Sequence, residues 1–295
     1  MTLEERLNTW TDLSSPTEKT KQKRTERMIE EAITAHAPLK SCTLDVYAKG
    51  SYANQTNVKA DSDVDIVVQC KNALYYDEAT PGCSGVSGVY DGEWSPYRLR
   101  TELEVALRKK FPDQIDNSGS IAIKIASSSA RVDADVVPCF DYRYYWSSSS
   151  YVEGTRIFRK NNSSLENYPA QQLSEGATKD TNTLWSYKAT VRILKRVENL
   201  MAESGFHHEV PSFFVECLTY NCPNRLFIEA TWTNRVRNVL IHLWGNLAGS
   251  EPQHEPDRWL EANNRKFLFD TSQPWTRSDG KAFAKAAWNY LGYGE

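Results

Sequence analysis

Two carboxylates and a glycine-serine pair stand close together in the first third of this chain. Asp63 and Asp65 lie in the segment DSDVDIVVQC at 61–70, and Gly50 and Ser51 precede it. The polar–apolar alternation and β-branched run of 61–70 predict a strand. Because side chains of a strand alternate between faces, the two carboxylates share one face. Such a pair suits Mg²⁺ (or Mn²⁺), and the N–H groups of a turn before an expected helix suit phosphate.

A second predicted strand adds further carboxylates. The segment RVDADVVP at 131–138 offers Asp133 and Asp135 on one face. An Asp inside a β-branched strand is unfavourable unless it is exposed or paired. Three carboxylates on two neighbouring strands can hold two metal ions roughly 3.5–4 Å apart, which activates an attacking oxygen and stabilises a leaving one. The residues therefore indicate phosphoryl or nucleotidyl transfer.

The surrounding elements predict an α+β fold. A mixed-sheet lobe with an N-terminal helix would occupy residues 1–165, and a helical lobe residues 166–295, with the active site in the cleft between them. Hydrophobic periodicity and capping residues predict strands at 42–49, 63–70, 119–126 and 131–138, strand-like segments over 141–159, and helices at 17–36, 96–111, 181–201, 211–221, 231–248 and 279–291.

Composition limits the class of protein. The chain of 295 residues is 40% hydrophobic and contains nine Trp, which is enough for a packed core. No apolar run approaches the roughly 18–20 residues of a membrane span, and the N-terminus lacks a signal-peptide profile. The six Cys form no CxxC pair, so we expect reduced thiols and a cytoplasmic location. A net charge of −3 disfavours long nucleic acid as a partner and favours small nucleotides.

The motifs of this chain resemble those of a known family. The segment GSYANQTNVKADSDVDIVV is similar to the glycine-serine and DxD signature of polymerase-β-like nucleotidyltransferases. Together with ADVVP, SYKATVRILK and PSFFVECLTYN, it resembles the bacterial cyclic GMP-AMP-synthase-like and DncV-like nucleotidyltransferases (CD-NTases). The four motifs occur in the expected order over about residues 45–225.

The resemblance implies a role for each motif residue. Gly50 and Ser51 would hold a triphosphate, and Asp63 and Asp65 would ligate both metal ions. Asp135 would bind the catalytic metal and assist deprotonation of the attacking ribose hydroxyl.

Other positions are open to two interpretations. Asp133 is the alternative to Asp135 as the third metal ligand, and we prefer Asp135 because it matches the D-V-V-P motif. Asp61 is interpreted as a cap or turn residue rather than a ligand. Lys188 lies where relatives place a lysine on the triphosphate, or is an ordinary helix lysine. Ser212 would contact phosphate, and Phe213 would stack on a base or belong to the core.

The resemblance also implies a reaction. The leading hypothesis is a template-independent synthase that joins nucleoside triphosphates into a cyclic di- or trinucleotide and releases pyrophosphate. Its product would act on a responsive effector protein in bacterial anti-phage signalling. The alternatives are a nucleotidyltransferase that acts on RNA ends or a protein acceptor, and a catalytically silent nucleotide-binding sensor.

Overall fold

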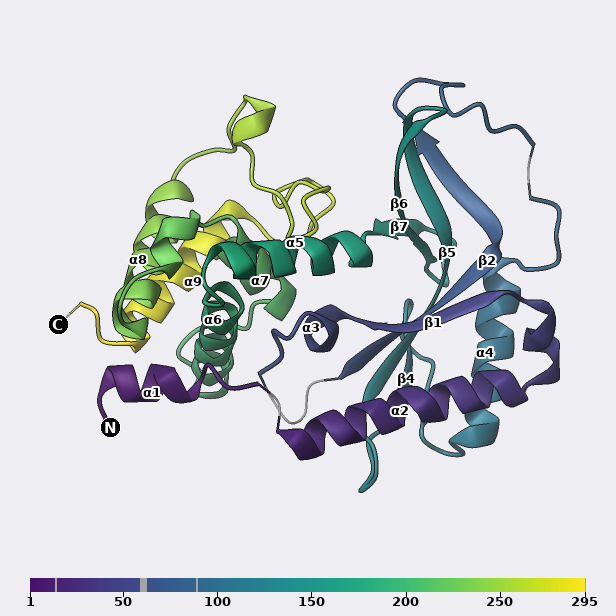
Figure 1. Cartoon of the computed structure of the whole chain (residues 1–295), viewed down its shortest axis with the longest axis horizontal. Helices are drawn as coiled ribbons and strands as arrows, with labels where there is room; N and C mark the ends of the chain where they lie inside the picture. The colour runs from purple at the N-terminus through teal and green to yellow at the C-terminus, as the bar shows by residue number, and fades with distance from the viewer. Residues whose placement is uncertain (14, 59–62, 89, 295) are drawn as a thin grey trace. The chain divides into compact units, whose positions relative to one another are not determined.

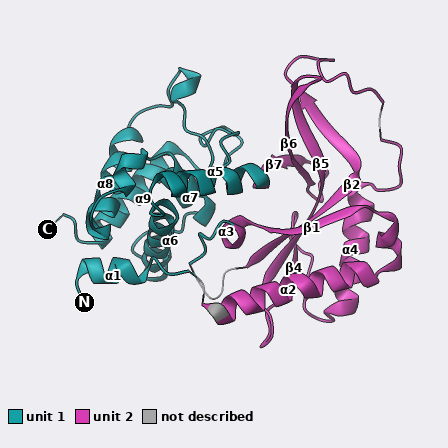
Figure 2. Cartoon of the chain, in the orientation of Figure 1, with its two compact units in different colours: residues 1–13, 54–58, 170–295 teal, residues 14–53, 59–169 magenta. Residues whose placement is uncertain are grey.

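A computed structural model of the chain describes residues 1–13, 15–58, 63–88 and 90–294 (Figure 1). The chain divides into two compact units, each formed by separate stretches of sequence (Figure 2). The sheet unit comprises residues 14–53 and 59–169, and the helical unit residues 1–13, 54–58 and 170–295. Residues 1–13 and 54–58, which we assigned to the catalytic lobe, thus group with the helices. The α+β class is confirmed.

The sheet unit is built on one mixed sheet. Within the described ranges its strands are β1 (Leu44–Lys49), β2 (Val64–Glu78), β3 (Ile115–Asp116), β4 (Ile123–Ile125), β5 (Ala134–Ser147), β6 (Ser150–Phe158) and β7 (Ser164–Asn167). The order is β1-β2-β5-β4-β3, and β6 pairs with both β5 and β7. Only the β2–β5 pairing among these is parallel. This pairing places the two predicted Asp strands side by side.

Helices α2 (Pro16–Ala35) and α4 (Pro96–Lys110) bury their apolar residues in the core of the sheet unit. Both begin at a serine cap. The Ser15 hydroxyl accepts a hydrogen bond from the Glu18 backbone N–H, and the Ser95 hydroxyl accepts one from Arg98. Leu99, Leu103 and Leu107 of α4 recur at helical spacing and are fully buried. Both helices confirm the sequence prediction, and β1 continues into the short helix α3 (Gly50–Ala53).

The helical unit has its own hydrophobic core. Its helices are α1 (Leu3–Thr9), α5 (Pro169–Asn182), α6 (Tyr187–Glu203), α7 (Ser212–Tyr220), α8 (Trp232–Asn246) and α9 (Arg277–Tyr290), joined in part by 3₁₀ turns at Asn224–Phe227 and Glu255–Asp257. The amphipathic α6 contributes Val191, Leu194 and Val197 to the core. Among the described residues, none of the helices has the length and apolar composition needed to cross a membrane.

One predicted helix is wrong at its start. We expected a helix over 181–201, but α5 ends at Asn182 and α6 begins at Tyr187. Between them Leu184 and Trp185 have φ values of +52° and +64° and are exposed. Left-handed backbone cannot continue an α-helix. The apolar side chain of Leu184 matched the helical period of α6, although it points to solvent.

Candidate active site

The phosphate-binding turn predicted from the sequence lies where β1 passes into α3. Gly50 has φ +72°, a left-handed conformation that glycine adopts without strain. A Cβ at this position would collide with the Oδ2 atom of Asp65 and lie 3.2 Å from its Cγ. Gly50 is therefore required for two reasons, the backbone angle and the close approach of a carboxylate. Ser51 follows as the second residue of α3 and is half-buried.

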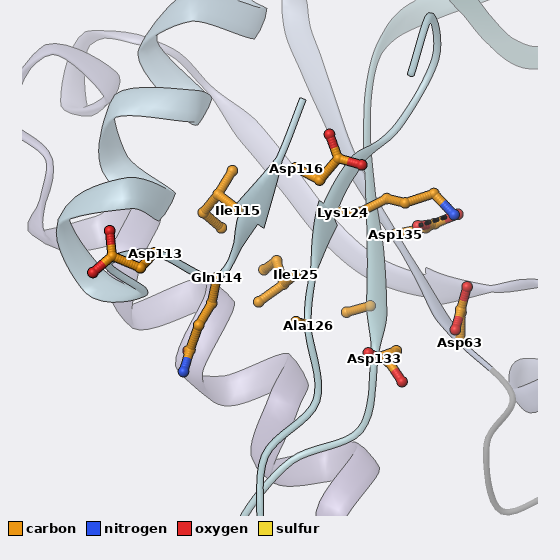
Figure 3. A pocket seen from close by; sticks show the side chains of 11 residues that line it. Asp63, Asp113, Gln114, Ile115, Asp116, Lys124, Ile125, Ala126, Asp133 and Asp135 are labelled. Carbon is orange, nitrogen blue, oxygen red and sulfur yellow. Dashed lines mark ion pairs between the residues drawn. The ribbon is translucent and has the colours of Figure 1, made fainter. Parts of the chain in front are cut away.

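Strand pairing brings the predicted carboxylates to one region of the sheet. Asp65 on β2 is the cross-strand partner of Asp135 on β5, and on its other side it pairs with Lys49 of β1. Asp63 immediately precedes β2. Lys124 of β4 is the cross-strand partner of Asp135, and its Nζ atom lies 3.9 Å from Asp135 Oδ1. Figure 3 shows this ion pair, with Asp63 nearby.

The environment disfavours the ionised form of these carboxylates. Burial raises the pKa of Asp65, Lys49 opposes this effect and Asp63 adds to it. Burial also raises the pKa of Asp135, against the effect of Lys124 and with that of Asp63 and Asp65. The pKa of Asp63 is raised in the same direction, first by burial. Carboxylates that repel one another in a partly buried site are a common setting for a bound cation.

Asp133 is held differently from Asp135. Its Oδ1 atom accepts a hydrogen bond of 2.6 Å from the backbone N–H of Ser127. One oxygen is thus used to close the loop between β4 and β5. Asp61, the other residue with two interpretations, lies outside the described residues. No group of three His, Cys, Asp or Glu side chains in the described ranges has an arrangement that could hold a metal ion as it stands. The three-carboxylate metal site stays a prediction.

A cavity of about 450 Å³ opens beside these carboxylates. Figure 3 shows Asp63, Asp133 and Asp135 along one part of its wall, with Lys124. The rest of the lining comes from Ala134, from β3 and β4, and from the chain just before and after these two strands, through Asp113, Gln114, Ile115, Asp116, Ile125 and Ala126. Among the described residues, the lining of this cavity thus combines acidic side chains with the basic side chain of Lys124.

The remaining predicted site residues belong to the helical unit. Lys188 is the second residue of α6, and its backbone N–H donates to Asp180 Oδ1 at 2.9 Å. Burial lowers the pKa of Lys188, while Asp180 acts in the opposite direction. Ser212 is the exposed first residue of α7. Phe213 packs against the helical core, with its ring centroid 6.3 Å from that of Trp275. Their contacts with a nucleotide remain predictions.

The comparison with known proteins decides the family. Residues 174–292 match the family model of the cGAS/DncV-like nucleotidyltransferase C-terminal helical domain. The chain is 31% identical to the cyclic dipyrimidine nucleotide synthase CdnE of Cecembia lonarensis, over 98% of both chains. It belongs to the cGAS/DncV-like nucleotidyltransferases. The predicted family is confirmed, and the protein is a nucleotidyltransferase of the kind that makes cyclic nucleotides.

Other relatives support the same assignment. The CdnE of Legionella pneumophila, also named a cyclic dipyrimidine nucleotide synthase, is 33% identical over 98% of this chain and 97% of its own. The solved structure of Elizabethkingia meningoseptica CdnE cyclic dinucleotide synthase with GTP and Apcpp is 31% identical. It has a TM-score of 0.81 and covers 98% of this chain and 99% of its own.

Sequence reasoning missed several polar residues near the motifs. Lys124 stands between Ile123 and Ile125, and this alternation already places it on the opposite face from two core residues. Lys195 and Glu216 interrupt apolar stretches of α6 and α7 and are almost fully buried. A charge inside an apolar helical stripe is a signal that could have been used.

Proposed function

We propose that Asp63, Asp65 and Asp135 form the catalytic centre that joins nucleoside triphosphates into a cyclic oligonucleotide with release of pyrophosphate. Gly50 and Ser51 would bind the triphosphate. The observation that carries this proposal is the pairing of Asp65 with Asp135 on adjacent parallel strands, with Gly50 against the Asp65 carboxylate. Lys188, Ser212 and Phe213 are proposed as further nucleotide contacts from the helical unit.

The donor set fits a divalent metal. The proposed ligands are carboxylate oxygens, which Mg²⁺ and Mn²⁺ prefer, and their pKa values are raised by burial and by neighbouring carboxylates. Two such ions, when bound, would neutralise phosphate charge and lower the pKa of the attacking hydroxyl. The residues of the chain would orient the triphosphate at the turn and hold the acceptor hydroxyl near Asp135, which accepts its proton.

The substrates are proposed to be nucleoside triphosphates, with no template and no long nucleic acid. Relatives of similar identity are named for dipyrimidine and for dipurine products, so the bases must be determined with all four nucleotides present. We propose that the product acts on a responsive effector protein in anti-phage signalling. A cytoplasmic location stays a prediction from the sequence.

The proposed function is tested by incubating the purified protein with Mg²⁺ or Mn²⁺ and four labelled nucleoside triphosphates, with and without RNA. We expect a phosphatase-resistant cyclic product and pyrophosphate without RNA, both lost in Asp63→Ala. Mass spectrometry identifies the bases and the ring size. Label on RNA or on protein alone would contradict cyclic synthesis, and bound nucleotide without product would indicate a sensor.

Lys124→Met tests the cation beside Asp135. The ammonium group is 3.9 Å from Asp135 Oδ1, where it competes with a metal for the same carboxylate. Since the lysine side chain is 55% exposed, its effect is screened by solvent. We expect the Mg²⁺ concentration for half-maximal activity to fall about two- to fivefold, measured by titration at saturating nucleotide. Lys109→Met, an exchange of an exposed lysine in the last turn of α4, is the control, and an equal shift there would exclude a local effect.

A further inference from the structure

The segment Asn54–Val58 connects the two halves of the proposed catalytic motif. It follows Ala53, the last residue of α3, and precedes the stretch that leads to Asp63. Although its neighbours on both sides belong to the sheet unit, the segment itself belongs to the helical unit (Figure 2). The chain therefore enters the helical unit directly after the phosphate turn and leaves it before the DxD strand.

A buried carboxylate binds this segment. Glu216 of α7 accepts hydrogen bonds from Asn54 Nδ2 at 2.8 Å and from Thr56 Oγ1 at 2.7 Å. Gln172 of α5 donates to the same carboxylate at 2.8 Å, and Lys195 Nζ of α6 lies 2.7 Å from it. Both carboxylate oxygens thus have two donors each. Three helices and the segment meet at one side chain.

The centre of the network is closed to solvent, although Gln172 at its edge is only half-buried. Glu216 and Lys195 have side chains 1% and 2% exposed, and Asn54 and Thr56 are fully buried. Burial alone would raise the pKa of Glu216, but the Lys195 ammonium and the hydrogen bonds hold it below its ordinary value. Gly176 of α5 leaves the room for Asn54, because a Cβ there would lie 2.7 Å from Asn54 Oδ1.

A second contact fixes the backbone of the same segment. Arg192 of α6 donates from Nη1 to the Gln55 carbonyl at 2.6 Å and from Nε to the Thr11 carbonyl at 2.8 Å. Gln55 itself has φ +59°, a left-handed conformation that a non-glycine residue keeps only when its surroundings impose it. The side chains and the backbone of the segment Asn54–Val58 are therefore both held in one conformation.

We propose that Glu216 is a positioning residue of the nucleotide site, which fixes Asn54 and Thr56 and so holds the backbone that leaves the Gly50-Ser51 turn. Apolar residues could bury this segment equally well, and a buried ion pair adds little net stability compared with them. Directional hydrogen bonds instead select one conformation of the segment. This inference rests on the proposed function, since it assigns the turn to the triphosphate.

The test compares three exchanges of buried threonines. Thr56→Val keeps the shape and removes the hydroxyl that donates to Glu216, whereas Thr56→Ser retains it. Thr219→Val is the matched control, because Thr219 of α7 is equally buried but donates only within its own helix, to the Val215 carbonyl at 2.7 Å. We expect Thr56→Val to lower kcat/KM about 10- to 100-fold, Thr56→Ser to regain most of it, and Thr219→Val to change melting temperature without changing kcat/KM.

Hydrogen exchange provides a readout that does not depend on catalysis. In Thr56→Val, amides of residues 50–58 should exchange faster than in wild type and in Thr219→Val. The inference is overturned if Thr56→Val and Thr219→Val lower the melting temperature by the same amount and both keep the kcat/KM and exchange rates of the wild type. Glu216 would then have only a structural role. If the wild type makes no product, the proposed function fails, while the exchange comparison still shows whether the network holds the segment.

Discussion

Asp65→Asn should strongly reduce the rate of cyclic synthesis while the fold persists. Asp65 pairs with Asp135 across β2 and β5, and loss of its charge removes one proposed ligand of both metal ions. We expect kcat to fall by about 10²- to 10³-fold. The measurement is initial-rate release of pyrophosphate at saturating Mg²⁺ and nucleotide.

The same exchange should not destabilise the metal-free protein. Burial, with a contribution from Asp63, raises the pKa of Asp65 in the folded state. A carboxyl with a raised folded-state pKa costs stability above that pKa, and this cost disappears as the pH falls and the group is protonated. The neutral Asn removes the cost at pH 7, so the melting temperature without metal should be unchanged or higher.

Asp45→Asn separates a site effect from a general loss of charge. Asp45 lies on β1, its side chain is 59% exposed, and its ion pair with Lys71 at 3.7 Å is worth little. Activity and melting temperature should both stay near wild type. An active Asp65→Asn enzyme, or one that has lost its fold, would contradict the role assigned to this carboxylate.

Local sequence patterns predicted what depends on neighbours in the chain. The polar–apolar alternation and β-branched residues around Asp63, Asp65 and Asp135 indicated strands, and β2 and β5 confirm them. The expected helix at 96–111 agrees with α4, whose start is capped by Ser95. Such features arise from a few consecutive residues, for which sequence rules hold.

The features that were missed depend on contacts between distant residues. Glu216 binds Asn54 and Thr56, which lie 162 and 160 residues earlier in the chain. Nothing in the periodicity of α7 identifies these partners. The break before α6 has a local cause instead. The apolar Leu184 fits the helical pattern of the sequence, although its φ is +52°. Residues 54–58 group with the helical unit because of long-range contacts such as those with Glu216.

Gly50→Ala should impair both stability and activity more than an ordinary glycine exchange. Alanine at φ +72° carries a backbone strain of roughly 1–2 kcal/mol. Its Cβ would also meet the Asp65 carboxylate, so either the turn or the carboxylate must move. Displacements of about 1 Å in a catalytic site cost about 10²-fold in rate. We expect a loss of that size in kcat/KM, measured with a matching thermal or denaturant unfolding curve.

Gly82→Ala distinguishes strain from collision. Gly82 has a similar φ of +81°, but a Cβ there meets nothing within 4 Å. It should show the strain alone and keep wild-type kcat/KM. The unfolding free energy of Gly50→Ala should fall further than that of Gly82→Ala, and the difference measures the collision.

A double-mutant cycle identifies the colliding group. Asp65→Ala removes the carboxylate, after which the nearest remaining Asp65 atom to the new Cβ would be 3.6 Å away, an ordinary contact. Gly50→Ala should therefore destabilise the Asp65→Ala protein less than the wild type, with a coupling of about 1 kcal/mol. Zero coupling would show that Gly50 serves only the backbone angle. A positive coupling would show that the glycine is needed so that the phosphate turn and the Asp65 carboxylate can share one site.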